Sequence, residues 1–354
     1  MLLLIGLGLL LKLKFRNKEQ TDGLKEIVLS VALPSTIFIA LMKVDVDAKL
    51  FLVPVLTLTF NFFLYFTLPF VLPFFGIERH SATGRTLLML LPSLAPGLSC
   101  FPFIAEFLGS NSLAMAALAD VGNKFFVLIF LYVAALNMYL ATTNGKSTKV
   151  SQKIKSLLIN LLKEPINVII LAAVILLSFG VSYKGLPSLM TELFDKTSAM
   201  MTPLVLIFIG LAVQFKEGNK RIVSSILLFR AGFTMLFSAL MIGLLGIHEP
   251  TLVLLAVVLP LSSASFWPFA HISAFNRKED KAEIPKDRRT FNVELSVLVL
   301  AFSLPFSTLL ILGILSAGSF FTHLPTLVVS GLCLMGLSAV PYVLGKRILK
   351  LSKV

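Results

Sequence analysis

Prolines and ionisable side chains gather in one apolar stretch of the chain, from Pro92 to Lys124. The first part of the stretch is broken by prolines and the second carries polar groups: Pro92, Pro96, Pro102, Glu106, Asp120, Asn123 and Lys124. A proline inside a helix removes a backbone donor and clashes with the preceding turn, so a helix surrounded by lipid tolerates it only where protein or water satisfies the freed carbonyls. Such a break is either a kink or a binding site.

A second copy of the motif favours a site. Ser99-Cys100-Phe101-Pro102-Phe103 recurs in the second half of the chain as Ser265-Phe266-Trp267-Pro268-Phe269. Three further pairs keep nearly the same offset: Ile37-Phe38-Ile39-Ala40-Leu41 with Ile207-Phe208-Ile209-Gly210-Leu211, Phe60-Asn61 with Phe229-Arg230, and Gly76-Ile77 with Gly246-Ile247. Because these matches share nearly one register, they predict an internal repeat.

The composition places the chain in the membrane. Of the 354 residues 57% are hydrophobic and 14% charged, and the mean hydropathy is +0.93, which is too apolar for a soluble fold. The net charge of +13 does not indicate nucleic-acid binding, because the basic residues lie in short segments between hydrophobic runs. Both cysteines, Cys100 and Cys333, lie inside apolar runs, so neither a disulfide framework nor a metal site or cofactor is expected.

Hydrophobic runs predict an all-α protein with eleven membrane spans. They are expected at 1–11, 24–42, 50–76, 86–108, 112–141, 164–183, 198–215, 222–247, 250–274, 290–317 and 322–345. The first is short for a span. We expect a short first helix rather than a signal peptide, because its lysines follow the apolar core and no cleavage site appears.

Loop charges orient these spans. With the N-terminus outside, most of the 31 lysine and arginine residues fall on inner segments, so the loop at 142–163 and the C-terminus are predicted to be cytoplasmic, in a plasma (inner) membrane. Because each repeat has five helices, the second copy enters from the opposite side, and the repeats are inverted. The expected divisions are 1–141 for the first repeat, 142–163 for the loop, 164–317 for the second repeat, and 318–354 for an extra helix and basic tail.

Several segments resemble one family of membrane proteins. Val31-Ala32-Leu33-Pro34, PGLSCFPFIAEFLG (96–109), LAMAALADVGNKFF (113–126) and SAMMTPLVLIFIGLAV (198–213) are similar to the auxin efflux carrier permeases of the bile acid and arsenite transporter superfamily. The resemblance covers about residues 1–317. It implies two inverted five-helix repeats in which the proline-broken fourth and ninth helices cross, with auxin or dicarboxylate substrates.

The proline-broken segments supply the candidate substrate site. Pro102 and Pro268 are ordinary kinks or mark the crossover, and their symmetric placement favours the crossover. The serines beside them either bond back to their own helices or hold a substrate carboxylate or an ion. The candidate substrate-binding residues are Ser99, Cys100, Pro102, Ser262, Ser263, Ser265, Pro268 and Arg230.

Charged residues inside spans are the candidates for coupling. Asp120 and Lys124 form a structural i,i+4 pair, or Asp120 and Asn123 bind a cation or proton while Lys124 replaces the cation. Asn292 and Glu294 are expected in the equivalent place of the second repeat. Glu106 is placed at the outer mouth, with a gating or proton role as the alternative.

Two further side chains leave alternatives open. Arg230 either pairs with Glu294 or attracts an anionic substrate, since its guanidinium suits a carboxylate. His271 is expected to be packed, and a titrating role is the alternative.

The sequence therefore predicts a secondary carrier of small organic anions that works by alternating access. A sodium-coupled symporter of the bile acid type is the alternative, and a membrane sensor or assembly partner is a more remote one. Proton, sodium or no coupling stays open, as does a homodimer. The diphosphate, H-E-x-x-H and G-x-S-x-G motifs of membrane enzymes are missing, so no enzyme is expected.

Overall fold

The computed structural model describes residues 2–15, 17–43, 52–143, 150–212 and 220–351. Within these ranges the chain is helical and contains no β-strand. The first half comprises α1 (Leu2–Leu11), α2 (Lys18–Ile27), η1 (Val28–Ala32), α3 (Leu33–Met42), α4 (Leu52–Val71), η3 (Leu72–Phe75), α5 (Ala82–Leu90), α6 (Pro96–Ser99), α7 (Phe101–Phe107), α8 (Gly109–Phe125), η4 (Phe126–Phe130) and α9 (Leu131–Thr143). The second half comprises α10 (Val150–Lys163), α11 (Pro165–Ser178), η5 (Tyr183–Gly185), α12 (Ser188–Ala199), α13 (Met201–Ala212), α14 (Lys220–Leu245), α15 (Pro250–Val258), α16 (Phe266–Lys281), η6 (Lys286–Arg288), α17 (Val293–Ala317), η7 (Gly318–Thr322) and α18 (Leu324–Leu351).

Among the residues that the structure describes, six helices are long and apolar enough to cross a membrane. They are Glu19–Met42, Val53–Phe75, Gly109–Thr143, Ser188–Ala212, Arg221–Leu245 and Val293–Thr322. A bent pair, Ile154–Lys163 with Pro165–Ser178, gives a seventh if it is counted as one span. The other predicted spans are short, as α1 is with its 10 residues, or interrupted, as around α5 and α15. For the span predicted at 322–345, the apolar part Leu324–Val340 of α18 is shorter than the six. The chain is an all-α membrane protein.

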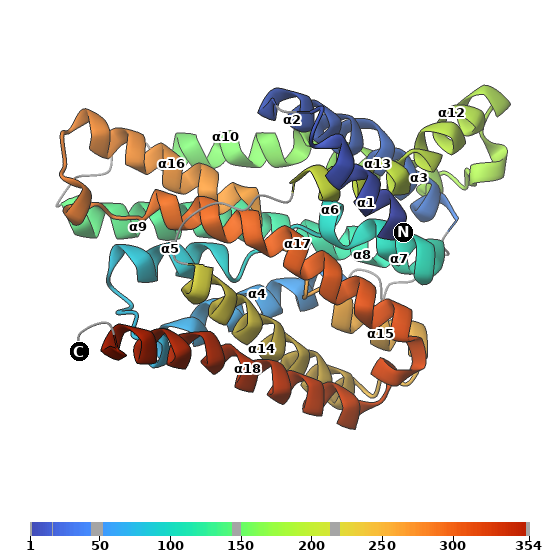
Figure 1. Cartoon of the computed structure of the whole chain (residues 1–354). Helices are drawn as coiled ribbons and strands as arrows, with labels where there is room; N and C mark the ends of the chain where they lie inside the picture. Colours follow the sequence, from blue (N-terminus) through green and yellow to red (C-terminus); the bar gives the residue numbers. More distant parts are fainter. Residues whose placement is uncertain (1, 16, 44–51, 144–149, 213–219, 352–354) are drawn as a thin grey trace.

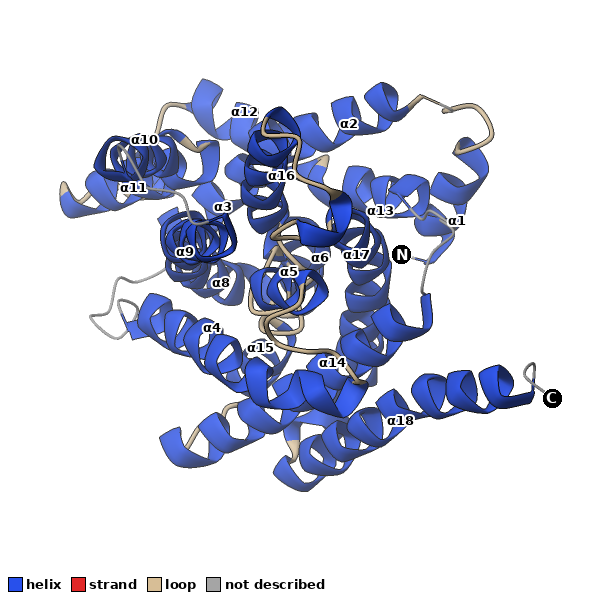
Figure 2. Cartoon of the chain, turned by 90° about the vertical axis from the view of Figure 1, so that its left-hand side faces the viewer, coloured by secondary structure: helices blue, strands red, loops and turns tan. Residues whose placement is uncertain are grey.

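The helices form two groups (Figures 1 and 2). Helices α1, α2, α3, α12 and α13 lie on one side, and α4, α14 and α18 lie on the other. Glycine permits close contact in both groups: a Cβ on Gly210 would lie 2.2 Å from the carbonyl oxygen of Ile5, and one on Gly232 would lie 2.5 Å from that of Gly331. These contacts hold α1 against α13 and α18 against α14.

Two helical segments stop near the centre of the molecule and restart after a few residues. Helix α5 ends at Leu90 and α6 begins at Pro96, while α15 ends at Val258 and α16 begins at Phe266. Pro92 and Pro260 lie in these gaps, which are 91–95 and 259–265 and are called here the interrupted segments. The repeated motif centres the expected breaks on Pro102 and Pro268. A one-residue break does lie beside Pro102, at Cys100 between α6 and α7, but the longer interruptions precede Pro96 and Phe266, and both prolines lie in first turns of helices. A proline is tolerated there because the N–H it lacks has no partner in a helix.

The connection predicted as a loop at 142–163 is largely helical. Helix α10 occupies Val150–Lys163 and meets α11 at an angle of 64°. One face of α10 packs inward through Leu157, whereas Leu158, Ile159 and Leu162 are exposed, with Lys155 before them and Lys163 after them in the sequence. Such a helix suits a membrane surface. The sequence predicts a loop there because of its lysines.

Candidate functional site

The two interrupted segments are hydrogen-bonded to each other. The backbone N–H of Ala95 donates to the carbonyl oxygen of Ser263 at 2.8 Å, and the N–H of Ser263 donates to Ser99 Oγ at 3.0 Å. The N–H of Ser265 donates to Ser93 Oγ at 2.9 Å. Residues from opposite halves of the sequence thus satisfy each other's backbone groups, as a non-helical segment buried at this depth requires.

The serine hydroxyls are mostly engaged within their own segments. Ser99 donates to the carbonyl of Ala95 at 2.8 Å, Ser262 donates to that of Leu259, and Ser265 caps α16 by accepting from the N–H of Trp267. The back-bonding alternative therefore describes Ser99 and Ser262. Within the described residues Ser263 Oγ makes no hydrogen bond, and Ser263 lies in the wall of a cavity.

Arg230 on α14 joins the two interrupted segments. Its Nε donates to the carbonyl of Leu91 at 2.8 Å, Nη1 to that of Ser262 at 2.8 Å, and Nη2 to that of Ser93 at 3.1 Å. The residue is 4% exposed. The expected pair with Glu294 is wrong, because Glu294 is exposed at the start of α17 and forms no ion pair among the described residues. Arginine instead compensates the negative ends of α5 and α15.

Asn123 on α8 holds the first interrupted segment from the other side. Its Oδ1 accepts from the N–H of Leu94 at 3.0 Å, and its Nδ2 donates to the carbonyl of Leu94 at 2.9 Å. Asn61 on α4 donates both to Asn123 Oδ1 at 2.9 Å and to the carbonyl of Pro92 at 3.0 Å. The amides replace the helical partners that Pro92 and Leu94 lack.

Ser303 on α17 has the corresponding role in the second segment. Its Oγ accepts from the N–H of Ala264 at 3.3 Å. The expected residues, Asn292 and Glu294, do not hydrogen-bond to this segment: Asn292 caps α17 by accepting from the N–H of Leu295 at 2.9 Å. The expected correspondence between Asn123 and Asn292 assumes one constant offset between the two halves of the chain. That assumption is wrong here, because the step along the chain from Asn123 to Ser303 is longer than the step from Leu94 to Ala264.

A buried charge cluster lies beside Asn123. Lys124 Nζ is 3.5 Å from Asp120 Oδ2 and 3.1 Å from Glu164 Oε2, and both side chains of the i,i+4 pair are 6% exposed. Asp120 Oδ1 also accepts from Asn123 Nδ2 at 2.8 Å. The structural pair of Asp120 and Lys124 is therefore present, and it is extended by Glu164, which the sequence did not single out. Glu164 occupies the bend between α10 and α11.

These groups line a cavity of about 480 Å³, which we call the polar cavity. The interrupted segments form one wall, and α2, α11 and α13 contribute to the opposite wall through residues such as Glu26, Ile166 and Phe208. Its polar side chains are Lys25, Glu26, Asp120, Asn123, Lys124, Glu164, Ser263 and Ser265. The N-terminal end of α16 opens into the same space through Ser265, Phe266 and Trp267.

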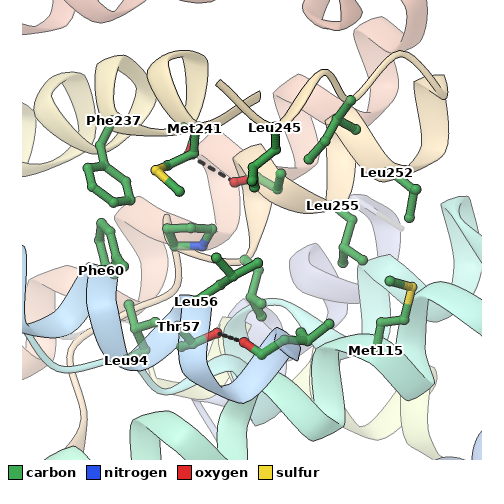
Figure 3. A pocket seen from close by; sticks show the side chains of 16 residues that line it. Leu56, Thr57, Phe60, Leu94, Met115, Phe237, Met241, Leu245, Leu252 and Leu255 are labelled. Atoms are coloured by element: carbon green, nitrogen blue, oxygen red, sulfur yellow. Dashed lines mark hydrogen bonds between the residues drawn. The ribbon is translucent and has the colours of Figure 1, made fainter. Parts of the chain in front are cut away.

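A second, apolar cavity of about 180 Å³ also reaches the interrupted segments (Figure 3). Phe60 and Phe237 line it and contact each other, with ring centroids 5.3 Å apart, and Met115, Met241 and Leu255 also lie around it. Its two hydroxyls donate to backbone carbonyls, Thr57 to Val53 and Ser238 to Ala256. Leu94 lines both cavities and is 2% exposed, so it forms part of the wall between them.

The remaining candidates take structural or surface positions. Cys100 is fully buried, with Sγ 3.5 Å from the carbonyl oxygen of Val258, and Pro102 and Pro268 are buried in helix starts. Glu106 is exposed near the end of α7. His271 is buried, and its Nε2 lies 3.0 Å from the carbonyl of Val127 in the π-helical turn η4, which agrees with a packed role.

Several residues of the site that were not expected nevertheless carry a signal in the sequence. Asn61 stands in a repeat match, and Ser93 directly follows Pro92. Glu164 precedes a proline at a predicted span boundary, where a charge is usually solvated. Ser303 has no signal, since a lone serine in an apolar helix is common.

The fold and the site together define a helical membrane protein with paired interrupted helices beside a charged cavity. No protein-family model and no curated protein matches the chain.

Proposed function

We propose that the protein is a secondary carrier of small organic anions, built from two inverted five-helix repeats whose fourth and ninth helices are interrupted and cross. The observation that carries the proposal is the direct bonding of the two interrupted segments, Ala95 to Ser263 and Ser263 to Ser99, at the wall of the polar cavity. Transporters with inverted repeats form their substrate sites from such half-helix ends and unwound backbone.

The helix ends favour an anion in the polar cavity. The N-terminal end of α16 carries a partial positive charge and opens into the cavity at Ser265, whereas the C-terminal ends of α5 and α15 are held by Arg230 on another side. Ser263 Oγ, which makes no hydrogen bond within the described residues, supplies a donor at the same wall. A carboxylate would thus meet a helix end, a hydroxyl and Lys124.

The charges of the cavity favour entry of a proton with the anion. Its walls carry two cationic side chains, Lys25 and Lys124, and three acidic ones, Glu26, Asp120 and Glu164. With all five ionised the cavity has a net negative charge, which opposes an anion. Protonation of one carboxyl removes that charge, so anion and proton enter together.

Transport would proceed by rocking of two bundles around the cavity. Helices α1–α3 and α11–α13 form one bundle, and the interrupted helices with α4, α8, α14 and α17 form the other, as the resemblance to the auxin efflux carriers implies. Lys124 and Glu164 belong to different bundles and lie 3.1 Å apart, so their ion pair bridges the moving boundary. In the predicted orientation, in a plasma membrane, the cavity-lining Lys25 and Glu164 lie at the cytoplasmic ends of their spans, so we expect this conformation to open toward the cytoplasm.

Flux in proteoliposomes tests the proposal. The purified chain is reconstituted and uptake is measured for a panel of mono- and dicarboxylates, with a pH gradient and a sodium gradient imposed separately. We expect saturable uptake of at least one carboxylate, driven by the pH gradient. Uptake driven by the sodium gradient instead would identify sodium, rather than a proton, as the coupling ion. No uptake above empty liposomes for any carboxylate would refute the carrier.

Matched variants tie flux to the site. Asp120→Asn is expected to abolish proton-driven uptake while counterflow exchange of the same substrate persists. Glu294→Gln removes an exposed carboxylate outside the cavity and is expected to leave both unchanged. If the two variants show equal proton-driven uptake, Asp120 is not the coupling residue.

A further inference from the structure

Two adjoining clefts lie beside the start of α5 and share no lining residue with the polar cavity. The first, of about 670 Å³, lies between the ends of α4 and α9 and the start of α5, and the second, of about 520 Å³, lies along the end of α4. Both are lined by Pro69, Arg79 and His80. Because they share these residues, the two clefts form one continuous groove around Arg79 and Arg85, which we call the basic groove.

The basic groove presents guanidinium donors that are already oriented. Arg79 Nε donates to His80 Nε2 at 2.8 Å, which leaves both of its terminal nitrogens for a ligand. Arg85 is fixed by three carbonyls, those of His80 at 2.5 Å, Thr290 at 2.7 Å and Arg289 at 3.5 Å. Three bonds use three of its five N–H groups, so two remain. Oriented guanidinium donors suit a phosphate.

The nearby carboxylates leave these donors available. Glu279 is fully buried, and its Oε1 accepts from the N–H and Oγ1 of Thr290 at 2.9 and 2.5 Å. Burial lowers the pKa of Arg85, and the charge of Glu279 opposes that shift. Glu78 lines the second cleft and is exposed. Within the described residues neither Arg79 nor Arg85 forms an ion pair.

An apolar path leads to the basic groove from the side of the molecule. Phe66 and Phe70 at the end of α4 and Phe74 on η3 recur every fourth residue and are 60%, 72% and 81% exposed. Phe70 also lines the second cleft, while Leu88 and Met138 line the first. In a membrane protein, large exposed phenylalanines at such spacing face lipid chains. The groove therefore joins a phosphate-binding end to a hydrocarbon-binding side.

We propose that the basic groove binds an anionic phospholipid, with its phosphate on Arg79 and Arg85 and an acyl chain along Phe66, Phe70 and Phe74. Basic pockets between membrane helices are suited to such headgroups. The bound lipid braces the interrupted helix. Arg85 ties α5 to residues 289 and 290, and Thr86 Oγ1 accepts from the N–H of Asn292 at 2.8 Å. The site stands whether or not the chain transports anions.

Thermal stability of the purified full chain in zwitterionic detergent tests the site. The probes are dioleoyl phosphatidylglycerol, dioleoyl phosphatidylcholine, glycerol 3-phosphate and inorganic phosphate, each titrated separately. Phosphatidylglycerol is expected to raise the unfolding temperature, and the other three are not. Arg79→Gln is expected to weaken the effect of phosphatidylglycerol about tenfold or more in concentration, because it removes a charge-assisted contact.

Two further variants separate the parts of the proposal. Arg277→Gln removes an exposed arginine of α16 that lines neither cleft, and it should respond to phosphatidylglycerol as the wild type does. Phe74→Gln should weaken the response to the lipid while its unfolding temperature without lipid stays at the wild-type value. An equal response of wild type and Arg79→Gln would overturn the site, and stabilisation by glycerol 3-phosphate equal to that by the lipid would overturn the lipid assignment.

Discussion

Replacing Arg230 by methionine removes the guanidinium that holds both interrupted segments. The substitution keeps a long flexible side chain but deletes three donors, those to Leu91, Ser93 and Ser262 at 2.8 to 3.1 Å. Three backbone carbonyls then remain buried at the ends of α5 and α15. The change therefore tests whether these bonds, rather than apolar packing alone, keep the segments together.

The magnitude follows from two opposing contributions. Each buried carbonyl left without a donor costs about 1–3 kcal/mol, so three cost about 3–9 kcal/mol. Removing the buried charge also removes its desolvation cost, which is several kcal/mol. In the wild type the three carbonyls already compensate that cost, so both contributions come from the same hydrogen bonds. We take the lower bound, a loss of about 3 kcal/mol in the free energy of unfolding, as the expected effect. On the scale of soluble domains this lowers the unfolding temperature by roughly 6–12 °C.

Thermal unfolding in detergent and carboxylate uptake in proteoliposomes give the two measurements. Arg221→Met is the matched control, because Arg221 lies on the same helix and is exposed. Arg230→Lys keeps the charge but presents its donors from one nitrogen, which cannot reach three carbonyls in a fork. We expect the lysine variant to lose stability as well, and the methionine variant to lose both stability and uptake.

The outcome separates a clamp from a substrate ligand. If Arg230 binds the substrate directly, Arg230→Lys should unfold at the wild-type temperature and raise the substrate concentration needed for half-maximal uptake. Unfolding of Arg230→Met at the temperature of Arg221→Met, with uptake retained, would refute the clamp.

Three other predictions concern the same framework. Asn123→Leu should abolish uptake, because it deprives the Leu94 peptide of both of its partners, and cysteine-labelling rates near residue 94 should rise. Lys124→Glu and Glu164→Lys should each block uptake, and the double exchange should restore part of it, since the pair at 3.1 Å is re-formed; no recovery would mean that the bridge is dispensable. Gly210→Val should detach α1 from α13, because the new Cβ lies 2.2 Å from the carbonyl of Ile5, and limited proteolysis near residue 15 should detect it, whereas Gly6→Val, which meets no atom within 4 Å, should be silent.

The helical membrane class could be predicted from hydropathy alone, because apolar runs of spanning length are rare outside membrane proteins. The general place of the site also followed, since proline and polar residues in apolar segments are costly unless partnered. Its detail did not. The repeated motif points to Pro102, where only the single residue Cys100 separates α6 from α7, whereas the longer interruption precedes Pro96. Helix starts accept proline, and the sequence does not say which proline follows the longer break.

Partners across the site were harder still. The constant offset expected between the two halves of the chain places Asn292 opposite Asn123, but Ser303, which lies further along the chain, takes that position. Carboxylates are the usual partners of arginine, yet Arg230 meets backbone carbonyls at two helix ends, which provide the same compensation. Carbonyls have no signature in a sequence, so contacts to unwound backbone cannot be read from it.

The two sides of the interrupted helices differ in how their charge responds to pH. On one side the negative ends of α5 and α15 meet Arg230, which stays charged at any physiological pH, so the charge on this side does not change. On the other, Asn123 connects the Leu94 peptide to Asp120, and Asp120 connects through Lys124 to Glu164 at the bend of α10 and α11. In the proposed carrier, the pH dependence of uptake is therefore expected from the cavity side, where Glu26, Asp120 and Glu164 lie. In the proposed carrier Glu164 belongs to the other bundle, so a proton gained there would also weaken its ion pair with Lys124.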